Sequence, residues 1–177
     1  MVWSVYDFNQ LKPSIVNILE TASPPANAFV ALDIDATVLN GIGLNVEPEP
    51  AAMFVREVAL EHNLPVVYIT AREDSAAGRA MALLDLAAVG ITNPYRVILR
   101  PSHVQTWEGI GLYKASARAR LEAETNSRCV MNVGDQWTDM MPTSDRSGLR
   151  LRCMFRDKYV LYDQLSDGVQ RWSLKLK

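Results

Sequence analysis

The chain has 177 residues, a net charge of −2 at pH 7 and 49% hydrophobic residues, which are values of an ordinary soluble globular protein. This length suits one domain with a sizeable core, so we treat residues 1–177 as a single domain. The near-neutral charge excludes the global basic field of nucleic-acid binders. Two histidines and no metal-spaced cysteine pair argue against a zinc site.

The first ten residues contain no basic region followed by a sustained apolar core, so we predict no signal peptide and a cytoplasmic protein. The longest uncharged apolar runs have the length of strands rather than of membrane spans. We therefore expect no membrane partner.

The hydrophobic pattern predicts helices alternating with strands. In chain order we expect a helix at about 7–21, a strand at 28–34, a loop at 40–50, a helix at 49–62, a strand at 65–70, a helix at 74–88, a strand at 95–99, a helix at 113–125, and strands at 129–134 and 149–155. The core spans about 28–155, and the tail 156–177 has no clear pattern. Alternation of this kind predicts an α/β fold with a doubly wound parallel sheet.

Polar residues follow three of the expected strands. Asp33, Thr70 and Asp135 lie where these strands end, and ligands of doubly wound sheets bind beyond the carboxyl ends of the strands. Asp33 and Asp35 are two residues apart on an extended chain, so we expect both to point into the same space. Two neighbouring carboxylates are unfavourable unless a cation, a proton or phosphate chemistry uses them.

Four motifs in order resemble the signature of the haloacid dehalogenase-like phosphohydrolases. They are Asp-x-Asp-x-Thr, a Thr after a strand, a Lys that opens a helix, and Gly-Asp-x-x-x-Asp. The residues that carry them are Asp33, Asp35, Thr37, Thr70, Lys114, Gly134, Asp135 and Asp139. The phrases Ile-Thr-Ala-Arg, Ile-Leu-Arg-Pro and Asn-Val-Gly-Asp-Gln-Trp-Thr-Asp look most like the acid phosphatase branch, with plant vegetative storage proteins and bacterial class B acid phosphatases.

This resemblance implies a Rossmann-like core and a Mg²⁺-dependent phosphatase. It implies that Asp33 is the nucleophile that becomes an aspartyl-phosphate, and that Asp35 protonates the leaving group and then activates water. Side-chain oxygens of Asp33 and Asp135 and the backbone carbonyl of Asp35 would bind the metal. Residues 38–64 and 71–113 are too short for a large cap, so we expect little or no cap domain and an open site.

The resemblance also implies a phosphate-binding group. Thr70 and the amide of Ala71 would hold the phosphoryl oxygens, Lys114 would offset their charge, and Asp139 would orient Lys114 or a metal-bound water. Two alternatives are open for Arg72: contact with the substrate phosphate, or pairing with the neighbouring acids at 73 and 74. Two alternatives are also open for each of three aromatic residues: stacking on a substrate ring, or ordinary packing. These residues are Trp107, Tyr113 and Trp137.

The expected substrate is a phosphorylated small molecule or an exposed terminal phosphate, with nucleic acid possible only as a substrate; the oligomeric state is not predicted. An alternative is a non-catalytic phosphate-binding or storage protein of the same family, against which the presence of Asp33 argues. A receiver domain also combines acids, a Thr, a Lys and Mg²⁺. Its motif order differs, because here an acidic motif follows Lys114.

Overall fold

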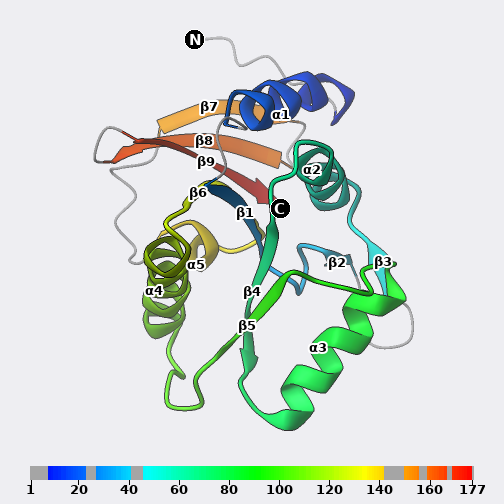
Figure 1. Cartoon of the computed structure of the whole chain (residues 1–177), viewed down its shortest axis with the longest axis vertical. Helices are drawn as coiled ribbons and strands as arrows, with labels where there is room; N and C mark the ends of the chain where they lie inside the picture. Colours follow the sequence, from blue (N-terminus) through cyan, green and yellow to red (C-terminus); the bar gives the residue numbers. More distant parts are fainter. Residues whose placement is uncertain are drawn as a thin grey trace.

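The structure, a computed structural model, describes residues 8–22, 27–40, 46–141, 150–155, 159–166 and 169–176. Seven strands form the main sheet, namely β1 (Ala28–Leu32), β4 (Val66–Glu73), β5 (Arg96–Arg100), β6 (Arg128–Gly134), β7 (Arg150–Phe155), β8 (Tyr159–Ser166) and β9 (Val169–Leu176). Their order is β5-β4-β1-β6-β9-β8-β7 (Figure 1). The pairings from β5 to β9 are all parallel, which confirms the predicted α/β fold with a parallel sheet.

Helices cover both faces of this sheet. They are α1 (Phe8–Ala22), α2 (Pro50–Glu61), α3 (Ala76–Ala88), α4 (Trp107–Thr125) and α5 (Trp137–Met140). Figure 1 shows α1 and α2 on one side of the sheet and α4 and α5 on the other. A two-stranded hairpin, β2 (Leu39–Asn40) with β3 (Glu47–Pro48), follows β1.

Strand β1 lies at the centre because its side chains are apolar on both faces. Val30 and Leu32 belong to the larger core cluster, with side chains of α1 and α2. Phe29 and Ala31 belong to a second cluster with side chains of α4. Strand β1 therefore holds the following residue, Asp33, between two packed layers.

The C-terminal tail, which showed no clear pattern in the sequence, forms strands. Strand β9 lies directly beside β6 and parallel to it, and β8 and β7 continue the sheet in antiparallel pairing. Leu161 and Leu174 are buried in the core, and Trp172 packs against it. Local pattern failed for β9 because its position depends on pairing with β6, a partner distant in sequence.

Helix α4 begins at Trp107, six residues before the predicted start at 113, so Lys114 does not open it. Thr106 caps it by accepting a hydrogen bond from the amide of Gly109. Gly109 and Gly111 in the first turns lower the helix propensity of this segment. The Thr106 cap and the burial of Gly111 stabilise the helix enough to offset that cost.

Strand β4 continues past Thr70 to Glu73, with a register irregularity against β5, whereas β1 ends two residues before the predicted 34. The other predicted elements differ from the structure by at most two residues at either end, the usual uncertainty of element boundaries.

No cap domain is present in the described part of the chain, because the hairpin, α2, β4, α3, β5 and their short connections account for the described residues between β1 and α4. None of the described helices is both long and apolar enough to cross a membrane.

The placement of β9 predicts a large effect of Leu174→Ala. Leu174 is 0% exposed, so truncation should lower the free energy of unfolding by about 2–5 kcal/mol. Leu84→Ala, at a side chain that is 64% exposed, is the control and should change it by less than about 0.5 kcal/mol. Urea denaturation checks both. Equal midpoints for the two variants would contradict the central position of β9.

Candidate active site

A tight turn directly after β1 shapes the first part of the site. The amide of Asp33 donates to the carbonyl of Val133 at 2.9 Å, which fixes Asp33 against β6. The carbonyl of Ile34 then accepts hydrogen bonds from three successive amides, the first being that of Thr37. Ala36 takes a left-handed conformation with φ of 55°, which costs an alanine about 1–2 kcal/mol. The turn places the Thr37 hydroxyl 3.4 Å from Asp33 Oδ2.

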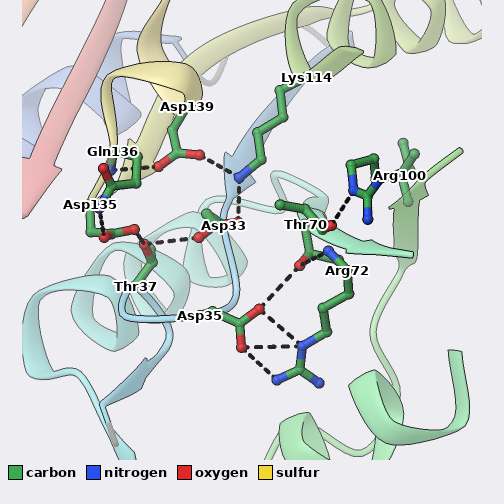
Figure 2. Close-up of polar contacts among 12 residues, drawn as sticks. Asp33, Asp35, Thr37, Thr70, Arg72, Arg100, Lys114, Asp135, Gln136 and Asp139 are labelled. Carbon is green, nitrogen blue, oxygen red and sulfur yellow. Dashed lines mark hydrogen bonds and ion pairs between the residues drawn. The ribbon is translucent and has the colours of Figure 1, made fainter. Parts of the chain in front are cut away.

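Lys114 lies between two buried carboxylates. Its Nζ is 2.6 Å from Asp33 Oδ1 and also donates to Asp139 Oδ1 (Figure 2). All three residues are at most 6% exposed. The helix α4, the end of β1 and the short helix α5 thus meet at one ammonium group.

Hydrogen bonds to its side chain and to its backbone carbonyl fix Asp139. Its Oδ2 accepts from the amide of Gln136 at 2.8 Å, and its carbonyl accepts from Asn132 Nδ2 and, at 2.9 Å, from Arg118 Nη1. A Cβ atom at Gly134 would lie 2.2 Å from Asp139 Oδ2, so only glycine fits there. These contacts leave Asp139 fixed in the position from which it binds Lys114.

Asp135 lies on the other side of Thr37. The Thr37 hydroxyl, which contacts Asp33 Oδ2, is 3.5 Å from Asp135 Oδ1. Asp135 Oδ2 accepts from Gln136 Nε2 at 2.5 Å. One oxygen each of Asp33 and Asp135 therefore faces the same small hydroxyl group.

A second lysine, which sequence reasoning missed, comes from β9. Lys175 Nζ donates to the carbonyl of Asp135 at 2.9 Å and lies 5.4 Å from the centre of the Trp137 ring. The signal for this residue was absent from the sequence, because the strand that carries it was not predicted. Lys175 fixes the loop that bears Asp135.

Asp35 has different surroundings from Asp33. Its side chain is 55% exposed, lies 3.4 Å from the Thr70 hydroxyl, and accepts a fork of hydrogen bonds from Arg72 (Figure 2). Arg72 pairs with Asp35 and, at 2.7 Å, with Asp85 rather than with the acids at 73 and 74. The two aspartates of the motif thus face the site with separate cationic partners.

The predicted phosphate-binding segment is part of β4. Thr70 is buried, and its hydroxyl accepts from the amide of Arg72 at 3.2 Å. The carbonyl of Thr70 accepts from the hydroxyl of Tyr113 at 3.2 Å, and that of Ala71 accepts from Arg100 Nε at 2.6 Å. Tyr113 is therefore a buried packing residue, and Arg100, not predicted from the sequence, fixes the backbone of Ala71.

Burial and mutual repulsion control the ionisation of the acids. Burial raises the pKa of Asp33 well above its usual range, the carboxylate of Asp139 adds to this, and Lys114 opposes it. Burial likewise raises the pKa of Asp135. Burial alone would lower the pKa of Lys114, but Asp33 and Asp139 outweigh it and raise that pKa. Lys114 therefore stays charged.

The acids form a set that fits a hard cation. Asp33, Asp135 and Asp139 each offer a carboxylate oxygen, and these oxygens lie within 4.8 Å of one another. With Lys114 charged, three ionised acids leave two uncompensated negative charges, which one divalent cation offsets. Oxygen ligands of this kind are those that Mg²⁺ prefers. The carbonyl of Asp35 as a further ligand stays a prediction.

Comparison with known proteins gives one family match. Residues 45–160, more than half of the chain, match the model of the family described as HAD superfamily, subfamily IIIB (acid phosphatase). The matched segment includes Thr70, Lys114, Asp135 and Asp139 and begins after Asp33. Curated proteins give no match.

Among solved structures, the fold is similar to that of the class C acid phosphatase from Bacillus anthracis, with a TM-score of 0.50 and 15% sequence identity. The similarity covers 75% of this chain and 65% of that enzyme, so the chain spans about two thirds of the length of the relative. At this identity the likeness shows a shared fold.

Lys114→Met should destabilise the protein strongly in the presence of EDTA. The substitution leaves the carboxylates of Asp33 and Asp139 buried without their cation, and breaking a buried pair costs about 3–5 kcal/mol. Urea denaturation measures the change. Arg120→Met, at a side chain that is 67% exposed, is the control and should cost less than about 1 kcal/mol. A Lys114→Met midpoint equal to that of wild type would refute the buried cluster.

Added MgCl₂ should raise the melting temperature, because a bound cation offsets the repulsion among the acids. At a hundredfold excess over Kd the rise is about 5–10 °C. Asp135→Asn should lose most of it, and Asp74→Asn, outside the cluster, should keep it. Differential scanning calorimetry decides, and an equal rise in both variants would speak against the assigned cation site.

Proposed function

Since the chain belongs to subfamily IIIB of the haloacid dehalogenase superfamily, the acid phosphatase family, we propose that it hydrolyses phosphate monoesters with Asp33 as the nucleophile. The observation that carries this proposal is the buried contact of Lys114 with Asp33 and Asp139, with Asp135 on the far side of Thr37. The ammonium of Lys114 contacts one oxygen of Asp33, and a divalent cation would bind on the side of Asp135. Two positive groups around the nucleophile suit an attack on an anionic ester.

In this proposal side-chain oxygens of Asp33 and Asp135 and the carbonyl of Asp35 would hold Mg²⁺. When bound, Mg²⁺ supplies positive charge that keeps the acids ionised and offsets the charge of the phosphate. Asp33 Oδ1 contacts Lys114, whereas Oδ2 faces Thr37 and Asp135, so the two oxygens have separate partners.

The reaction proceeds in two steps. A carboxylate oxygen of Asp33 forms a bond to phosphorus while the bond from phosphorus to the leaving oxygen breaks, and Asp35 gives its proton to that oxygen. Water then attacks the phosphorus of the aspartyl-phosphate, Asp35 takes the water proton, and inorganic phosphate leaves with Asp33 restored. The exposed side chain of Asp35 suits contact with both an alcohol and water.

The groups around the transferred phosphoryl are the Thr70 hydroxyl, the amide of Ala71 and the ammonium of Lys114. Thr70 and Ala71 are fixed by the bonds from Tyr113 and Arg100 to their carbonyls. Fixed donors stabilise developing negative charge without reorganising during the reaction.

The proposed substrates are phosphorylated small molecules or exposed terminal phosphates of larger ones. The absence of a cap domain from the described part of the chain supports an open site that excludes few esters by size. The alternative, a storage or phosphate-binding protein, lacks support because Asp33 is present. Hydrolysis of p-nitrophenyl phosphate with Mg²⁺, and its loss with EDTA, separates the two.

Asp33→Asn should lower kcat for p-nitrophenyl phosphate by roughly three orders of magnitude or more, because the amide oxygen is a poor nucleophile. Its melting temperature should stay near that of wild type, because the change removes charge from a crowded acidic cluster. Asp74→Asn is the control and should keep full activity. Near-normal turnover by Asp33→Asn would show that another group attacks phosphorus.

A further inference from the structure

Arg72 lies between two carboxylates that come from different elements. Its Nε is 3.2 Å and 3.0 Å from the two oxygens of Asp35, and its Nη2 is 2.6 Å from Asp35 Oδ1 (Figure 2). Its Nη1 is 2.7 Å from Oδ2 of Asp85, on helix α3. The guanidinium therefore links the turn after β1 to α3 through β4.

Asp85 has little other reason to be on α3. Aspartate is a poor residue for a helix interior, and the residues one turn before and after it are apolar, namely Met81, Ala82, Ala88 and Val89. Its side chain is 24% exposed, whereas most of α3 faces outward. The nearby Arg79 pairs with Asp74, at 2.9 Å, and not with Asp85.

Asp35 needs an external support to hold one orientation. Its side chain is 55% exposed and follows directly on the buried Ile34, and apart from Arg72 it contacts the Thr70 hydroxyl only at 3.4 Å. A planar guanidinium that binds both carboxylate oxygens fixes the plane of the carboxylate as well as its position. Asp85 binds Nη1 on the other side of the guanidinium, so Arg72 and Asp35 cannot rotate away together.

We propose that Asp85 is a positioning residue that holds Arg72 in the orientation in which Arg72 aims Asp35 at the leaving oxygen. This inference rests on the proposed function, in which Asp35 gives a proton to that oxygen. Asp85 itself touches neither substrate nor phosphate. Its effect reaches the reaction only through Arg72.

The consequence is a selective loss in Asp85→Asn. An alkyl phosphate, such as glycerol phosphate, has a poor leaving group that requires protonation, whereas p-nitrophenolate leaves with little help from an acid. Misplacing Asp35 should therefore lower kcat/KM for the alkyl ester by on the order of tenfold or more. It should lower kcat/KM for p-nitrophenyl phosphate by less than about threefold. The ratio kcat/KM is the quantity compared because kcat also contains hydrolysis of the aspartyl-phosphate, in which Asp35 takes the water proton for both esters.

Asp74→Asn is the matched control, because Asp74 also pairs with an arginine of the same region, but with Arg79 and not with Arg72. It should leave both esters unaffected. A second test places Asp85→Asn in an Asp35→Asn background, where it should have no further effect on either substrate. Melting temperatures of all variants should stay near that of wild type, because partly exposed ion pairs add little stability.

The assays use the full chain with Mg²⁺. Equal losses of kcat/KM on both esters, or an effect of Asp85→Asn that persists in the Asp35→Asn background, would overturn the positioning role of Asp85. Failure of the wild-type protein to hydrolyse either ester would instead refute the proposed function, and the inference about Asp85 would fall with it.

Discussion

The site depends on one buried ammonium group. Lys114 holds together the carboxylates of Asp33 and Asp139. Burial and the neighbouring Asp139 raise the pKa of Asp33, and Lys114 opposes this rise. Buried like charges are tolerated only with a close counter-charge and saturated hydrogen bonds. The contacts around Asp139, from Gln136 to Asn132, satisfy this condition and explain why so many polar groups converge on a short helix.

The sheet supplies the rigid frame for this contact. Strand β1 is buried on both faces, and β6 beside it fixes Asp33 through the carbonyl of Val133. Strand β9 then closes the other side of β6 and carries Lys175 to the carbonyl of Asp135. Acids from two strands therefore face each other across Thr37, because their backbones cannot move independently of the sheet.

Much of this could be predicted from the sequence, because its signals are local. The apolar run before Asp33, the helix–strand alternation and the motif residues from Asp33 to Asp139 needed only neighbours in the chain. The position of β9, and with it Lys175, depends on pairing with β6, which no local pattern encodes. The partners of Arg72 were missed for the same reason: Asp35 and Asp85 are distant in sequence, whereas the acids at 73 and 74 are adjacent.

The most direct test of the central claim is to trap the phosphorylated side chain. Borohydride reduces an acyl phosphate of aspartate to homoserine, and mass spectrometry of peptides from protein quenched during turnover with Mg²⁺ locates the change. We expect homoserine at position 33 and at no other aspartate. Ester hydrolysis that proceeds with residue 33 unmodified, or with the label on Asp35 or Asp135, would contradict it.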